Sequence, residues 1–162
     1  MKRFMTMALW LLCMTAVAQG SWTVSHRDAD ELKGQDARDV YLYEAPGVGT
    51  VVVWDWDKAD FRLITDNGFF KAYYYQGSKY YPITVGFYDD DGKLEKKFGL
   101  DLIEEYNHGG KYIATGGFYY GGRGNIRKLL SRMKSGKGYV RILADLYNRS
   151  AFDIMITPFE KQ

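Results

Sequence analysis

The clearest alternation of apolar and polar positions lies in residues 125–147. Four apolar residues recur at the spacing of one stripe on an α-helix: Ile126, Leu129, Leu130 and Met133. Asn125 suits the N-cap of this helix, and Gly136 suits its C-terminal cap. Beyond Gly136 the apolar period changes to two, which is the period of a strand with one buried face. We therefore expect an amphipathic helix over residues 125–135 that packs on a sheet.

From residue 39 onward, short runs of β-branched and aromatic residues are separated by turn residues. The expected strands are residues 40–44, 50–56, 61–65, 69–75, 81–88, 94–99, 111–120, 139–147 and 152–157. Asp66-Asn67-Gly68 is expected to close a hairpin between the third and fourth of these strands. The predicted fold is mainly β, with an antiparallel sandwich or a partly open barrel of about 8 to 10 strands.

Residues 101–107 fit two different structures. Asp101 and Glu104 could begin a short helix, whereas the apolar positions from Leu100 to Tyr106 alternate as in a strand. We favour a strand, because residues 107–110 would then form a hairpin turn into the next one.

The first residues predict export from the cytoplasm. Residues 1–18 combine a positive start, an apolar stretch and a small-residue cleavage site after Ala18, which is typical of a secretory signal peptide. Residues 19–36 are polar and predict an N-terminal arm, with Trp22 and Val24 as a possible short edge strand. Residues 37–162 then form one β-rich domain, and we expect a periplasmic or extracellular location.

Charge and cysteine content limit the partners and the kinds of site that we expect. The net charge of +2 comes from Lys2 and Arg3 within the signal peptide, so the remaining chain is neutral. Neutrality argues against nucleic acid as the principal partner. The only cysteine, Cys13, also lies in the signal peptide, and with two histidines in the chain we expect no metal centre and no cofactor. After cleavage no membrane span is expected, and the oligomeric state is left open.

Aromatic residues are unusually frequent, with 14 Tyr, 9 Phe and 4 Trp. Adjacent tyrosines in a strand point to opposite faces, so within each cluster at least one ring should face away from the core of a sheet with one wet face. Such rings suit a glycan, a peptide or an envelope protein as partner. The candidate binding residues are Trp56, Tyr74, Tyr81 and Tyr119. The alternative is that these rings fill the interfaces of a layered core.

A second hypothesis concerns two carboxylates. If residues 50–57 are extended, Trp54 and Trp56 share one face, and Asp55 and Asp57 share the other about 7 Å apart. Such a pair could perform acid and base chemistry in a glycan hydrolase. Strand-end aspartates facing water are the alternative.

A third hypothesis is an anion-binding or assembly subunit. Arg123, Gly124 and Arg127 lie around the expected helix N-terminus, where free backbone amides can hold an anion. A flexible glycine turn with a solvated basic helix face explains the same residues. The acidic residues 89–91 likewise fit either a cation site or a charged hairpin turn.

The C-terminal third carries a family resemblance. Ile126-Arg127-Lys128-Leu129-Leu130, Gly138-Tyr139-Val140-Arg141-Ile142 and Phe152-Asp153-Ile154 give a layout of helix, strand and final strand. This layout resembles small secreted bacterial β domains of unknown function, and it is similar to the invasion-associated locus B family without the cysteine pairs of that family. The resemblance implies an all-β envelope protein and transfers no functional residue. The leading prediction is an exported, non-enzymatic binding domain.

Overall fold

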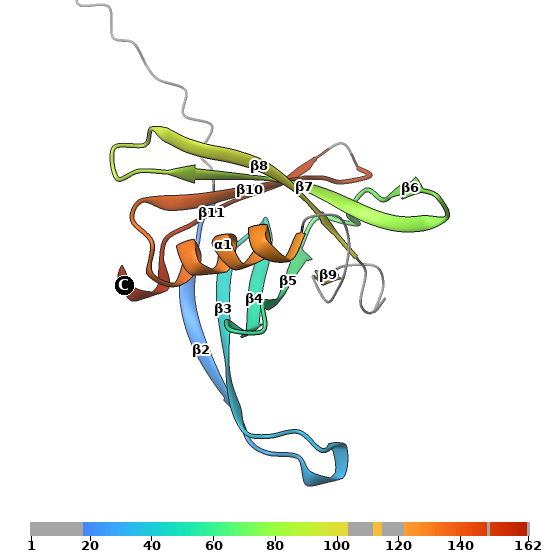
Figure 1. The fold of residues 1–162 in the computed structure, drawn as a ribbon, viewed down its shortest axis with the longest axis vertical. Helices are drawn as coiled ribbons and strands as arrows, with labels where there is room; N and C mark the ends of the chain where they lie inside the picture. The colour runs from blue at the N-terminus through green and yellow to red at the C-terminus, as the bar shows by residue number, and fades with distance from the viewer. Residues whose placement is uncertain (1–17, 104–111, 115–121, 149, 162) are drawn as a thin grey trace, which may run out of the picture.

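The computed structural model describes residues 18–103, 112–114, 122–148 and 150–161. Within these ranges eleven strands form two sheets, and one α-helix, α1 (Gly122–Ser135), packs with both (Figure 1). The protein is mainly β with antiparallel sheets, as predicted, and the described strands form no closed barrel. The two sheets and the helix form a sandwich-like α+β fold.

The first sheet has six strands. They are β1 (Ala18–Gln19), β6 (Tyr73–Tyr75), β7 (Ser78–Tyr88), β8 (Leu94–Leu102), β10 (Tyr139–Asp145) and β11 (Ala151–Ile156). Their order is β1-β11-β10-β7-β6, and β8 also pairs with β7. All these pairs are antiparallel except that of β1 with β11.

The second sheet has five strands in the order β2-β3-β4-β5-β9. They are β2 (Ser21–Arg27), β3 (Arg38–Ala45), β4 (Gly49–Asp55), β5 (Asp60–Thr65) and β9 (Tyr112–Ala114). Two short 3-10 helices complete the described elements, η1 (Glu31–Lys33) between β2 and β3, and η2 (Phe159–Lys161) after β11.

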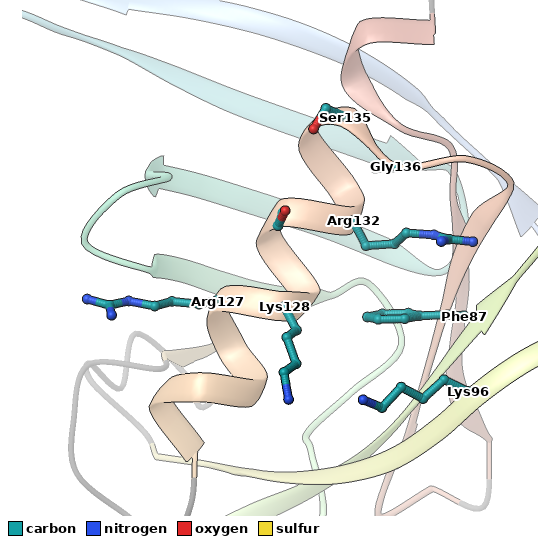
Figure 2. Close-up of a pocket in the computed structure, with 8 residues that line it drawn as sticks. Phe87, Lys96, Arg127, Lys128, Arg132, Ser135 and Gly136 are labelled. Carbon is teal, nitrogen blue, oxygen red and sulfur yellow. The ribbon is translucent and has the colours of Figure 1, made fainter.

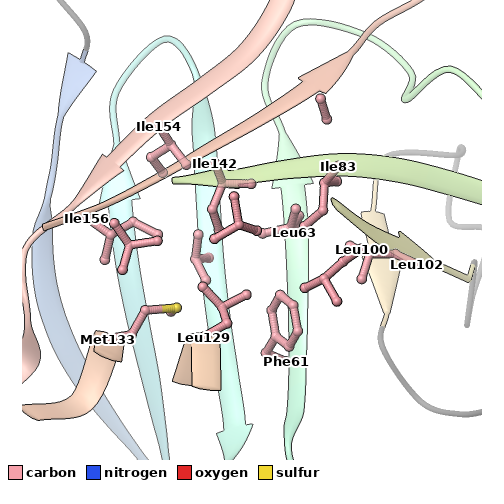
Figure 3. Close-up of a cluster of buried hydrophobic side chains, with 14 of the residues drawn as sticks. Phe61, Leu63, Ile83, Leu100, Leu102, Leu129, Met133, Ile142, Ile154 and Ile156 are labelled. Atoms are coloured by element: carbon pink, nitrogen blue, oxygen red, sulfur yellow. The ribbon is translucent and has the colours of Figure 1, made fainter. Parts of the chain in front are cut away.

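Alternate residues of both sheets meet in one core with the apolar stripe of α1 (Figure 3). The second sheet contributes Phe61 and Leu63, and the first sheet contributes Ile142 and Ile154. Burial of each such side chain is worth roughly 1.5–3 kcal/mol of transfer free energy. This shared core explains why a chain without a disulfide in its described part can hold two sheets together.

The helix matches its predicted stripe and its predicted C-terminal end, but not its predicted N-cap. Ile126, Leu129, Leu130 and Met133 are all buried. The helix begins at Gly122, so the prediction of Asn125 as N-cap was wrong. Gly136 closes the last turn by donating its N–H to the carbonyl of Arg132 at 3.0 Å, but the left-handed residue is Gly138, with a φ of 66°.

The predicted hairpin at Asp66-Asn67-Gly68 was wrong. β5, which precedes it, belongs to the second sheet, whereas β6, which follows it, pairs with β7 in the first. The chain therefore changes sheets at this turn. Burial of Phe70, which forms a bridge with Leu146, draws residues 69–72 toward the first sheet.

The predicted separation between an arm and a domain at residue 36 was also wrong. β2 pairs with β3 over seven positions, and Trp22 is buried in the common core. The indole Nε1 of Trp22 donates to the carbonyl of Thr157 at 2.6 Å, which ties this segment to the end of β11. The structure confirms the alternative that Trp22 and Val24 belong to an edge strand.

The ambiguous stretch after Leu100 continues as strand through Leu102, as favoured from the sequence. Its remaining positions from 104 to 107 lie outside the described residues. No helix in the described ranges has the length and the apolar character needed to span a bilayer.

Candidate functional site

The four predicted binding residues do not form one surface. Tyr74 is exposed on β6, whereas Tyr81 on β7 is only 6% exposed and belongs to the core. Trp56 is half-buried beside α1, and Tyr119 lies outside the described residues. The prediction that Tyr81 offers an exposed ring was therefore wrong.

The alternation of β7 explains the error at Tyr81. Tyr81 shares the inward face of the strand with Ile83 and Val85, which are buried. Tyr80 faces the other way, and its ring lies 6.2 Å from that of Tyr73 on β6. Adjacent tyrosines do point to opposite faces, but Tyr80 rather than Tyr81 is the outward member of its pair.

A cluster of exposed aromatic side chains gathers where β6 and the end of β10 meet. We use the name tyrosine patch for six aromatic residues on the hairpin of β6 and β7 and its neighbouring turns: Phe69, Tyr73, Tyr74, Tyr75, Tyr80 and Tyr147. Because adjacent strand residues alternate, Tyr73, Tyr75 and Tyr80 share one face of the hairpin and Tyr74 lies on the other, so the patch wraps both faces. Four of them are 50%, 72%, 58% and 61% exposed, namely Phe69, Tyr74, Tyr75 and Tyr147. In Figure 1 the hairpin of β6 and β7 extends from the body of the protein, so the rings of β6 are carried on a projecting element.

Hydrogen bonds between distant segments position the patch. The N–H of Tyr147 donates to the carbonyl of Phe69 at 3.1 Å, and the hydroxyl of Tyr147 accepts from the N–H of Ala72 at 3.2 Å. The hydroxyl of Tyr73 donates to the carboxylate of Asp145 at 3.4 Å. These contacts link the segment before β6 to the end of β10, so the rings stand on a fixed backbone.

The turn of the projecting hairpin is tight. Gln76 and Gly77 have φ values of 47° and 79°, which gives the turn the positive dihedrals that suit a two-residue hairpin. Tyr75 and Ser78 therefore pair directly, and the three residues of β6 lie in register with β7. This register puts Tyr74 opposite Lys79 and leaves Tyr74 exposed.

Trp56 lines a cavity of about 270 Å³ on one side of α1. Its ring packs 5.8 Å from Trp22 and 5.4 Å from Tyr41, so one side of the indole belongs to the core. Asp57 and Arg127 line the same cavity. Three residues that were predicted for three different functions are thus neighbours.

The predicted carboxylate pair lies in a turn. β4 ends at Asp55, and Asp57 follows in the turn before β5. Trp54 lies on the outer face of the sheet and Trp56 packs against the core, so the predicted common face of the two tryptophans was wrong.

Asp55 is already engaged by its own turn. Its Oδ1 accepts from the N–H groups of Asp57 and Lys58, both at 2.9 Å. The hydrogen bond from Lys58 is the main cause that lowers the pKa of Asp55 below its ordinary value. Asp55 therefore stays ionised at neutral pH, which does not favour the role of a general acid.

The predicted anion-binding residues lie on α1. Arg127 is exposed and lines the cavity beside Trp56 as well as a second, open cavity of about 580 Å³ on the side of β8. Figure 2 shows the side chains of Lys128 and Lys96 extending toward each other at this second cavity, which Phe87 also lines. Gly124 is exposed in the first turn of α1, and the side chain of Arg123 lies outside the described residues.

Charged side chains near the second cavity and in the acidic turn at residues 89–91 have partners of their own. Arg132, at the edge of the second cavity, donates to the carbonyl of Tyr88 at 2.8 Å and pairs with Glu95. In the acidic turn, Asp89 accepts two backbone N–H groups and Asp90 pairs with Lys161. The described part of the chain contains no group of three potential metal ligands.

Five patch members were not among the predicted binding residues: Phe69, Tyr73, Tyr75, Tyr80 and Tyr147. The runs of adjacent tyrosines were the available signal, but they do not tell which ring of a pair faces outward. Phe69 and Tyr147 meet only because residues 69–72 join the first sheet.

No family model, curated protein or solved structure matches this chain.

Proposed function

We propose that this protein is an exported binding domain that holds a glycan or polypeptide partner against the tyrosine patch. The single observation that carries the proposal is the concentration of exposed apolar surface. Seven large apolar side chains are exposed in the described ranges, and four of them, Phe69, Tyr74, Tyr75 and Tyr147, belong to this patch. Exposed apolar clusters of this kind mark interaction sites more often than scattered single residues do.

The chemistry of the patch suits a partner that is both flat and polar. Each tyrosine ring offers an apolar face for stacking and a hydroxyl for hydrogen bonding. Lys71 lies with its Nζ 5.5 Å from the ring of Tyr73, and Asp145 accepts from the hydroxyl of the same residue. Charged groups of both signs thus border the rings, which supports sugar hydroxyls or peptide groups as partners rather than a purely apolar ligand.

The shape of the patch supports an extended partner. Its residues line neither of the cavities beside α1. β6 pairs with β7 and lies at the end of the strand order of its sheet, and no other described strand pairs with its second side, where a partner could add a strand. A glycan chain, a peptide segment or the surface of an envelope protein fits such a projecting edge better than an enclosed small molecule does.

The hydrolase alternative has less support. Its acid and base pair was Asp55 with Asp57, and Asp55 is held ionised as a turn cap. Asp57 remains beside Trp56 in the smaller cavity without a second carboxylate among the residues that line it.

The test compares wild-type protein with the double variant Tyr74→Ala/Tyr75→Ala in a capture screen against soluble glycans and an envelope-protein extract. We expect the variant to lose at least about thirtyfold in affinity for whichever partner the wild type retains, because buried aromatic anchors contribute about 2 kcal/mol or more. Tyr74→Phe/Tyr75→Phe keeps both rings and should retain most of this affinity.

Leu32→Ala is the matched control. Leu32 is fully exposed in η1, in the long connection between β2 and β3, so this substitution removes an exposed apolar side chain away from the patch. Equal binding by wild type and Tyr74→Ala/Tyr75→Ala would refute the proposed function, as would an equal loss in Leu32→Ala.

A further inference from the structure

Three arginines surround one tryptophan on the outer face of the second sheet. The guanidinium carbons of Arg27, Arg38 and Arg62 lie 4.5, 4.6 and 4.7 Å from the ring centroid of Trp54. We call these four residues the arginine–tryptophan cluster. They come from four neighbouring strands, β2, β3, β5 and β4, and none of them lines the cavities beside α1 or belongs to the tyrosine patch.

The strand geometry aims Trp54 away from the core. Val51 and Val53 on β4 face inward and are buried, so the alternation places Trp54 outward. The pairing of β4 with β5 shifts register between Val53 and Asp55 and leaves Trp54 at the irregular position. Such bulges re-aim side chains and recur next to functional sites.

The placement of Arg27 and Arg38 is electrostatically costly. They occupy directly opposite positions of β2 and β3, where like charges destabilise the pair. Neither forms an ion pair with a described residue. Because each guanidinium carbon lies within 4.7 Å of one centroid, no two are farther apart than twice that distance. This separation is comparable with the Debye length of about 8 Å at physiological ionic strength, so the repulsion is only partly screened.

Two carboxylates lie on the same face as the cluster. Asp60 lies two residues before Arg62 on the same outward face of β5. Asp55 lies opposite Asp60 in the ladder, but it is engaged by its own turn and pairs with Lys58. The charges of Arg27 and Arg38 are therefore left without an ion pair among the described residues. A bound anion would supply the missing negative charge.

Guanidinium groups stacked on a ring are suited to hold an oxyanion. A guanidinium group that packs on a ring keeps in-plane N–H donors at its edge, and this planar fork matches phosphate, sulfate or carboxylate oxygens. Arg27 and Arg38 are exposed, so a solute can reach them. Packing on the half-buried Trp54 limits the freedom of their long side chains, which lowers the entropy lost on binding.

We propose that the arginine–tryptophan cluster is a binding site for a multivalent oxyanion, with phosphate or sulfate groups as its chemical class. Arg27 and Arg38 supply the principal donors, Arg62 adds the third cation, and Trp54 is the platform that positions them. This site is independent of the tyrosine patch, because it lies on the other sheet and uses charge rather than exposed apolar rings.

The test titrates wild-type protein with inorganic phosphate, and separately with sulfate, at an ionic strength kept constant with sodium chloride. Binding raises the melting temperature as the ligand concentration exceeds the dissociation constant, and tryptophan fluorescence follows site occupancy through a change at the ring of Trp54. We expect saturable binding of either ion in wild type. The double variant Arg27→Gln/Arg38→Gln should bind at least about tenfold more weakly, since it loses charge-assisted hydrogen bonds.

Arg127→Gln/Lys128→Gln is the matched control, because it removes the same amount of charge from the exposed face of α1. It should keep wild-type affinity, whereas Trp54→Phe should bind without the same fluorescence change. Arg38→Lys retains the charge but loses the fork, so weakened binding by this folded variant separates oriented donors from general attraction.

A stabilisation that follows ionic strength alone, equal affinity in Arg27→Gln/Arg38→Gln, or an equal loss in the α1 control would each overturn the proposal.

Glycerol phosphate in place of inorganic phosphate identifies the source of the group. Tighter binding of the monoester points to phosphate carried by a larger molecule, and tighter binding of the inorganic ion points to the free anion; both require the site.

Discussion

Individual tyrosines have two distinct roles in this chain, which are set by the face of the strand on which each one lies. Tyr43 is fully buried, and its hydroxyl donates to the carbonyl of Met155 at 2.7 Å while accepting the N–H of Gly20 at 3.0 Å. Tyr74, in contrast, is 72% exposed. The first fills an interface and satisfies buried backbone groups, and the second leaves ring and hydroxyl available to a partner.

Two glycines should respond in opposite directions to the same substitution. Gly138 has a φ of 66°, and a Cβ there would lie 1.8 Å from the backbone oxygen of Tyr88, so Gly138→Ala should destabilise the protein by more than about 1 kcal/mol. Gly124 lies in the first turns of α1 with no atom within 4 Å of an added Cβ. Gly124→Ala should therefore stabilise the protein by up to about 1 kcal/mol.

Urea denaturation of both alanine variants and the wild type measures these changes in the free energy of unfolding. The two variants serve as controls for each other because the chemical change is identical. A Gly138→Ala protein as stable as the wild type would mean that the turn between α1 and β10 differs from the one described.

Among the elements, the paired strands β2 and β3 form the second sheet's projecting hairpin. At its outer end the ring Nδ1 of His26 lies 2.9 Å from the carboxylate of Asp39, its partner in the ladder. Asp28 lies 3.7 Å from the other ring nitrogen. The hairpin thus carries a charge pair whose strength depends on the protonation of one histidine.

The hydrogen bond to Asp39 raises the pKa of His26 above its ordinary value of 6.5. A raised pKa in the folded state means that the pair stabilises the hairpin fully below pH 6.5, and that this contribution is lost as the pH rises through the higher folded pKa. A titration of the His26 ring by NMR should show this raised pKa. Asp39→Asn should bring it back toward 6.5, and an unchanged pKa in that variant would contradict the pairing.

Element types could be predicted from local periodicity, but their partners could not. The apolar period of two located β7 and β10, and the helical spacing located α1, because burial of one face imposes these periods. The turn after β5 instead joins two sheets, since the burial of Phe70 against the first sheet outweighs the local preference for a hairpin. β2 could not be recognised as a full strand from the sequence, because Trp22 is its only buried residue and the segment around it is polar.

At the scale of the whole molecule, the two proposed surfaces occupy different sheets around one core. The tyrosine patch belongs to the first sheet and its neighbouring turns, and the arginine–tryptophan cluster belongs to the outer face of the second. Neither surface could be assembled from the sequence. Phe69 meets Tyr147, and Arg27 meets Arg62, only after strands distant in the chain are placed in order. The exposure of Tyr74 could be predicted from the run of adjacent tyrosines, whereas the other members of the patch could be identified only from the strand pairing.

The central claim is that the tyrosine patch binds the partner, and protection of tyrosines from iodination tests it most directly. Free protein should be iodinated at Tyr74 and Tyr75 and spared at buried Tyr43, as mapped by peptide mass spectrometry. In complex with the partner retained in the capture screen, Tyr74 and Tyr75 should become protected. Equal iodination of Tyr74 and Tyr75 in the free and bound states would contradict the proposed function.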